Sequence, residues 1–232
     1  MRFVGYAMII GAMKSGTTSL HHIINQHPEI TAGRRKELNY FRGGASPDSA
    51  SYELEFPHLD KDKHVYTLDS SPNYTKSDRW AAAPARISQL PGQKKLIYIL
   101  RNPLERIDSQ IAHNIAQGRW TAENWLLRHV IDVSSYAKHI ARYENAGLLD
   151  DMLLLDFAEL CADPVDVSYR VQDFLGICRI QPKSVRARNI RKIDARFIQP
   201  AKAEEIKVHL KRDVAELITR YGFESAKSWE IV

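Results

Sequence analysis

The sequence predicts an α/β protein, a single-domain P-loop-type fold of three layers in which a central parallel sheet is flanked by helices. Apolar runs of strand length alternate along the chain with segments that carry helix signals, which is typical of a parallel sheet. Two of these runs also end in loops of the kind that open a helix. With 232 residues, 44% of them hydrophobic, the chain can bury a sizeable core, so we expect one domain over residues 1–232.

The first strand signal, Met8–Ile10, leads into a loop that predicts an anion site. Gly11 and Gly16 have the spacing of a phosphate-binding loop, G-x-x-x-x-G-K-S/T, but Lys14 is the only cation in the loop. A helix that opens at Gly16 directs unpaired backbone N–H groups into the loop. The hydroxyl side chains that follow are Thr17, Thr18 and Ser19. The displaced lysine argues against an ordinary magnesium-dependent triphosphatase, and a plain strand-to-helix turn stays open.

The second strand signal, Leu96–Leu100, is continuously apolar, as expected of a strand buried on both faces. Suitable N-cap, first and third helical residues follow it: Asn102, Pro103 and Glu105. Arg101 then stands at the carboxyl end of the strand, where ligands bind in open α/β sheets, and we expect it to face the same crevice as Lys14. Ser109 lies about two helical turns further on. An arginine fork with a hydroxyl predicts a second phosphate site.

Other signals continue the alternation. Strands are expected at His64–Leu68 and Met152–Leu155. Helices are expected at Thr121–Asp132, Ser135–Ala146, Pro164–Leu175 and Ala203–Tyr221. Glycines follow the last three of these helices, at the position that glycine often takes beyond a helix end: Gly147, Gly176 and Gly222.

With these motifs, the chain resembles sulfotransferases that use 3′-phosphoadenosine 5′-phosphosulfate (PAPS). Lys14–Ser19 is similar to the family's 5′-phosphosulfate loop, and Arg101 with Ser109 to its 3′-phosphate motif, R-D/N-P-x-x-R-x-x-S. Arg35–Phe41 resembles the segment K-E-x-x-F/Y-F, and Asp69–Tyr74 the segment S-P-x-Y. The similarity covers most of the chain and is closest to the carbohydrate-directed branch, which includes heparan-type and bacterial enzymes. It implies that the donor-binding residues are Lys14, Ser15, Gly16, Thr17, Thr18, Ser19, Arg101 and Ser109.

The resemblance also implies a mechanism. Glu37 would be the general base that takes the proton of an acceptor hydroxyl, and Lys14 would stabilise charge on the bridging oxygen of the donor. The acceptor would be a carbohydrate or a glycosylated small molecule, and 3′-phosphoadenosine 5′-phosphate (PAP) the product. Since fixed protein charges fill the role that magnesium has in phosphoryl transfer, we predict no metal. The residues alone leave Glu37 open as a solvated loop carboxylate beside Lys36.

Two segments depart from the family pattern. Several heparan-type relatives carry a lysine where Ser70 stands, and the family's third cofactor segment is poorly matched by Arg186–Arg196. Within that segment, Arg191 or Lys192 is a candidate contact of the 3′-phosphate.

Two other functions stay open. A P-loop kinase would use the same loop for ATP, but it should carry a lysine after Gly16 and an acidic residue at a strand end for magnesium, for which Asp69 or Asp156 could serve. A non-catalytic nucleotide-binding module would keep Lys14 and Arg101 without a working base.

Composition limits the partners. A formal charge of +5 and a pI near 9.1 fit a polyanionic donor. The densest basic cluster, residues 183–196, has no interleaved aromatics and no DNA-binding signature, so we predict no nucleic-acid partner. The sequence contains no apolar span of 18 residues, which predicts no transmembrane segment, and its two cysteines favour a reducing, cytoplasmic location. The oligomeric state is not predicted.

Overall fold

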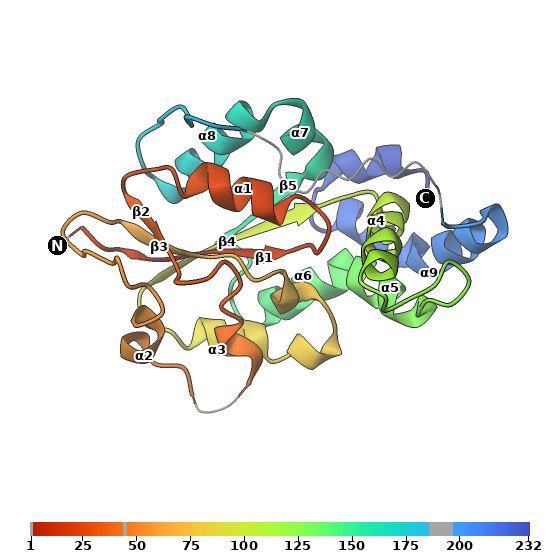
Figure 1. Cartoon of the computed structure of the whole chain (residues 1–232), viewed down its shortest axis with the longest axis horizontal. Helices are drawn as coiled ribbons and strands as arrows, with labels where there is room; N and C mark the ends of the chain where they lie inside the picture. Colours follow the sequence, from red (N-terminus) through yellow and green to blue (C-terminus); the bar gives the residue numbers. More distant parts are fainter. Residues whose placement is uncertain (1, 44–45, 186–196) are drawn as a thin grey trace.

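The five strands in the described part of the chain form one parallel sheet, in the order β2-β3-β1-β4-β5. The computed structural model describes residues 2–43, 46–185 and 197–232. The strands are β1 (Gly5–Gly11), β2 (Ile30–Ala32), β3 (Tyr66–Asp69), β4 (Gln93–Leu100) and β5 (Met152–Asp156). Because all pairs are parallel, the carboxyl ends of the strands lie at one edge of the sheet (Figure 1).

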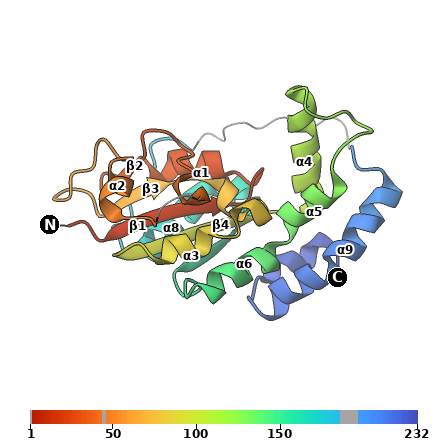
Figure 2. The ribbon, with the colours of Figure 1, turned by 90° about the horizontal axis from the view of Figure 1, so that it is seen from below.

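Helices cover both faces of this sheet, which gives the three layers that the sequence predicts (Figures 1 and 2). One face packs against α1 (Thr17–Ile24), α7 (Phe157–Ala162) and α8 (Pro164–Leu175). The opposite face packs against α2 (Ser49–Glu53), α3 (Ala83–Ser88), α4 (Pro103–Ala116), α5 (Leu127–Ser134), α6 (Tyr136–Asn145) and α9 (Pro200–Thr219). Short 3-10 helices are η1 (Tyr40–Arg42), η2 (Pro72–Thr75), η3 (Asp78–Trp80) and η4 (Glu224–Trp229). Among the described residues, no helix is long and apolar enough to cross a membrane.

The core lies on both sides of the central strands. Successive residues of β1 alternate between the faces: Ala7 and Ile9 join the cluster beneath α1 and α8, whereas Met8 and Ile10 join the larger cluster on the other face. All four side chains are fully buried. Parallel strands buried on both faces read as continuous apolar runs, and this is why β1 and β4 were recognisable in the sequence.

The predicted helices agree with the structure except at their ends. The helix expected at Thr121–Asp132 begins only at Leu127. The reason is a local turn, in which the Thr121 hydroxyl accepts a hydrogen bond from the Asn124 N–H over 3.1 Å and so competes with helix formation. The last helix begins at Pro200, ahead of the expected Ala203, because proline fits the first helical position.

Candidate active site

The loop between β1 and α1 has the geometry of an anion cradle. Gly16 precedes α1 with a left-handed backbone (φ +80°), no side chain caps the helix, and its first turn contains no acidic residue. A Cβ atom on Gly16 would lie 2.9 Å from Leu160 and 3.1 Å from Phe157, so only glycine fits. The Ser15 hydroxyl is buried beneath the loop without a hydrogen-bond partner. Free helix N–H groups and an unpaired buried hydroxyl together fit a bound phosphate or sulfate group.

Arg101 connects this loop to the end of β4. Its guanidinium donates a hydrogen bond to the Lys14 carbonyl over 3.1 Å and lies 4.5 Å from the centre of the Phe157 ring. A second hydrogen bond, of 3.3 Å, joins it to Glu105 one helical turn further on. β1 and β4 are neighbours in the sheet, and the connections that leave them run in opposite directions along it. The ends of β1 and β4 therefore form the switch point of the sheet, and Lys14 and Arg101 line one cleft there.

A cleft of about 900 Å³ opens at this edge. Nine residues were singled out from the sequence as donor-binding residues or as the base, and all except the buried Ser15 line the cleft: Lys14, Gly16, Thr17, Thr18, Ser19, Glu37, Arg101 and Ser109. Ser109 comes from α4, whose N-cap is Asn102, as expected: its side chain accepts the N–H of Leu104 over 3.0 Å. Four separate segments thus contribute to one cavity.

Glu37 lies in the same cleft, on the segment between β2 and η1. Its side chain is 45% exposed, and its carboxylate forms an ion pair of 3.1 Å with Lys36. A half-exposed carboxylate at the mouth of a cationic cleft can accept a proton from a second substrate.

Sequence reasoning missed further residues of the cleft. Gln110, His113 and Asn114 belong to the α4 face that carries Ser109, and their spacing of one helical turn could have found them. Lys76, Arg119 and Trp120 come from loops, which no periodicity predicts. Asn73 lies in the short helix η2 and His129 near the start of α5. Burial lowers the pKa of Lys76, with Arg119 and Arg79 acting in the same direction. Burial, followed by Lys76, also lowers the pKa of His129.

Two further predictions concern this site: that it needs no metal ion, and that Arg191 or Lys192 contacts the 3′-phosphate of the donor. Within the described ranges, no group of three or more His, Cys, Asp or Glu side chains could hold a metal ion, and metal independence stays a prediction. Arg191 and Lys192, the candidate contacts of a 3′-phosphate, lie outside the described residues.

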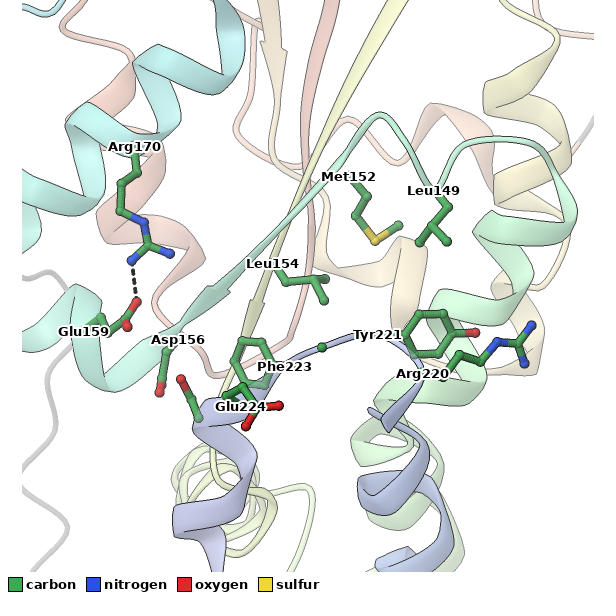
Figure 3. A pocket seen from close by; sticks show the side chains of 12 residues that line it. Leu149, Met152, Leu154, Asp156, Glu159, Arg170, Arg220, Tyr221, Phe223 and Glu224 are labelled. Atoms are coloured by element: carbon green, nitrogen blue, oxygen red, sulfur yellow. Dashed lines mark hydrogen bonds and ion pairs between the residues drawn. The ribbon is translucent and has the colours of Figure 1, made fainter. Parts of the chain in front are cut away.

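A second cavity, of about 510 Å³, lies at the edge strand β5 (Figure 3). Its apolar lining includes Met152, Leu154 and Phe223. Both of its arginines are already paired, Arg170 with Glu159 over 2.5 Å and Arg220 with Glu144 over 2.7 Å. This cavity therefore offers no preformed anion cradle, and the cleft at the Lys14 loop is the better candidate site.

The fold and the cleft define a class of protein: a P-loop-type α/β protein with a cationic cleft at the carboxyl edge of its sheet. Residues 6–220 of the chain match the sequence model of the family described as "Sulfotransferase domain". The chain therefore belongs to the PAPS-dependent sulfotransferase family.

Relatives and solved structures agree with this assignment. The human bifunctional heparan sulfate N-deacetylase/N-sulfotransferase 1 is 29% identical over 194 residues, and the match covers 73% of this chain and 22% of that protein. Mouse heparan sulfate glucosamine 3-O-sulfotransferase 3B1 is 29% identical over 187 residues, with coverage of 75% and 46%. The chain thus matches less than half the length of these curated relatives.

Solved structures with a similar fold include a bacterial and a mouse sulfotransferase. A sulfotransferase from Alicyclobacillus acidocaldarius superposes with a TM-score of 0.76 at 22% identity, covering 96% of this chain and 98% of that one. Mouse sulfotransferase SULT7A1, complexed with PAP, gives a TM-score of 0.59 at 16% identity, covering 99% and 88%.

Proposed function

We propose that this protein transfers the sulfuryl group of PAPS to an acceptor hydroxyl by in-line displacement. The observation that carries the proposal is the meeting of the Lys14 loop, Arg101, Ser109 and Glu37 in one cleft. The helix N-terminus and Lys14 suit the 5′-phosphosulfate end of the donor, and Arg101 with Ser109 suits the 3′-phosphate.

In the reaction, the acceptor oxygen bonds to sulfur while the bond from sulfur to the bridging oxygen breaks. Glu37 accepts the hydroxyl proton, and Lys14 stabilises the negative charge that collects on the bridging oxygen as PAP leaves. Since charge is stabilised by fixed cations and amides, we propose that no metal is needed.

The acceptor is proposed to be a carbohydrate or a glycosylated metabolite. The support is the pair of relatives named for heparan sulfate, which share 29% identity with the chain. The cations beside Glu37 can donate hydrogen bonds to sugar hydroxyls, and the Trp120 ring in the cleft lining offers a surface on which a sugar ring can stack.

Two rival functions are less well supported. A kinase using ATP would need a lysine where Thr17 stands, and Asp69, one candidate for its metal, is fully buried. A non-catalytic module would have no need of a carboxylate at the cleft, where Glu37 lies.

Calorimetric titration with PAP and with ATP, each in EDTA and in magnesium, tests the donor. We expect tight, metal-independent binding of PAP and weak binding of ATP. A magnesium-dependent preference for ATP would refute the sulfotransferase proposal. Glu37→Gln then tests the base: PAP binding should persist while the rate of transfer from PAPS to desulfated heparin falls roughly 10²- to 10⁴-fold.

A further inference from the structure

The end of β3 carries a buried carboxylate that the proposed chemistry does not use. Asp69 is fully buried and accepts hydrogen bonds from the hydroxyls of Ser71 (2.6 Å), Tyr74 (2.7 Å) and Tyr52 (3.3 Å). Burial raises the pKa of Asp69 to about 6, and these hydrogen bonds oppose the rise. A buried carboxylate is costly unless hydrogen bonds compensate it, and these three hydroxyls supply that compensation.

The partners of this strand end lie on both sides of Glu37. The Ser70 N–H donates to the Lys36 carbonyl over 3.2 Å, immediately before Glu37. The Asn39 N–H donates to the Ser71 hydroxyl over 3.0 Å, and that hydroxyl in turn donates to Asp69. We call residues 36–39 the base loop. Its main chain is thus held at two positions, by the Ser70 N–H and by the Ser71 hydroxyl.

Contacts within the base loop cannot fix it against the rest of the molecule. The ion pair between Glu37 and Lys36 joins neighbours that move together. Asn39 has a left-handed backbone (φ +56°), which is uncommon outside glycine and persists where surrounding contacts hold it. In this structure its N–H bond to Ser71 and its side-chain bond to Asn73, of 3.0 Å, provide such contacts.

We propose that Asp69 and Ser71 are positioning residues, which hold the base loop so that the Glu37 carboxylate stays at the place where the acceptor hydroxyl reacts. This inference rests on the proposed role of Glu37. Misplacement of a catalytic group by about 1 Å costs on the order of 10²-fold in rate, so a loosened loop should lower kcat while leaving the donor site intact.

A matched pair of variants tests the proposal. Ser70 and Ser71 are both fully buried, and Ser70→Ala removes a hydroxyl whose partner is the His21 ring (2.8 Å), leaving the Ser70 N–H bond to the base loop in place. Ser71→Ala removes the bridge between Asp69 and the Asn39 N–H. Hydrogen exchange of the Asn39 amide should accelerate roughly tenfold or more in Ser71→Ala and remain near the wild-type rate in Ser70→Ala.

Kinetics separate positioning from general stability. With PAPS and desulfated heparin, Ser71→Ala should lower kcat roughly tenfold and Asp69→Asn about 10²-fold, with PAP affinity within about twofold of wild type. Ser71→Thr restores the hydroxyl and should recover the rate. In a Glu37→Gln background, Ser71→Ala should cause no further loss, since residues that act through one another are not additive.

Equal amide exchange in the two serine variants would overturn the positioning role, as would a fall in PAP affinity that parallels the fall in kcat. A different result bears on the proposed function itself: retained transfer by Glu37→Gln would remove Glu37 as the base, whatever the serine variants do.

Discussion

Replacement of Arg101 by alanine gives the sharpest test of the donor site. The side chain is only 17% exposed, donates to the Lys14 carbonyl over 3.1 Å, and stacks on Phe157 at 4.5 Å. A hydrogen bond to a charged phosphate is worth about 1.5–3 kcal/mol. Since about 1.4 kcal/mol is a tenfold change, Arg101→Ala should weaken PAP binding roughly 10- to 150-fold.

Two control variants sharpen the reading of this titration. Arg101→Lys keeps the charge but loses the planar fork, so the affinity for PAP should fall between wild type and alanine. Glu105→Gln removes the carboxylate that pairs with Arg101 at 3.3 Å and should leave PAP affinity equal or slightly higher, because a negative charge near the anion is gone. Calorimetry at fixed ionic strength measures all three. An Arg101→Ala protein that binds PAP within twofold of wild type would refute the 3′-phosphate assignment.

Three other predictions concern the loop and the helix that follows it. Gly16→Ala meets Leu160 at 2.9 Å with φ at +80° and should lose about 2–4 kcal/mol of stability, seen as a lower Tm, together with PAP binding; an unchanged Tm would contradict the clash. Lys14 has φ +70°, so Lys14→Gly should be about 1 kcal/mol more stable than Lys14→Ala, while both lose transfer activity; equal urea midpoints would count against backbone strain. Burial lowers the pKa of His21 from 6.5 to about 4. The unfolded chain therefore binds more protons at this site between those pH values, and stability falls as the pH drops through them. His21→Asn should show a smaller loss of urea stability between pH 7 and pH 5 than wild type, and an equal loss would contradict the assignment.

The sequence was sufficient where local chemistry determines structure. Continuous apolar runs identified β1 and β4 because both faces of these strands are covered. Asn102 was recognisable as an N-cap because an asparagine side chain before Pro103 can accept a backbone N–H of the first helical turn. The meeting of the Lys14 loop with Arg101 followed from the rule for parallel sheets.

What escaped prediction depends on contacts between distant segments. Phe157 lies against Gly16 and Arg101 although it is far from both in sequence. The network around Asp69 was visible only as an S-P-x-Y segment, since its partner Tyr52 comes from α2, a helix of five residues without a periodic pattern. Cleft residues on loops, such as Lys76 and Trp120, are placed by tertiary packing, which no local signal encodes.

The register between the central strands β1 and β4 determines the relative position of the two cations in the cleft. Ile9 lies opposite Ile97, and this pairing sets where Lys14 and Arg101 stand relative to one another. A slip of one residue between β1 and β4 would carry Arg101 about 3.3 Å along the strand and turn it to the other face of the sheet. The same slip would exchange the side chains of β4 between the two core clusters, since Tyr98 packs on one face of the sheet and Ile97 and Ile99 on the other. The packing that fixes this register therefore also fixes the separation of the two cations.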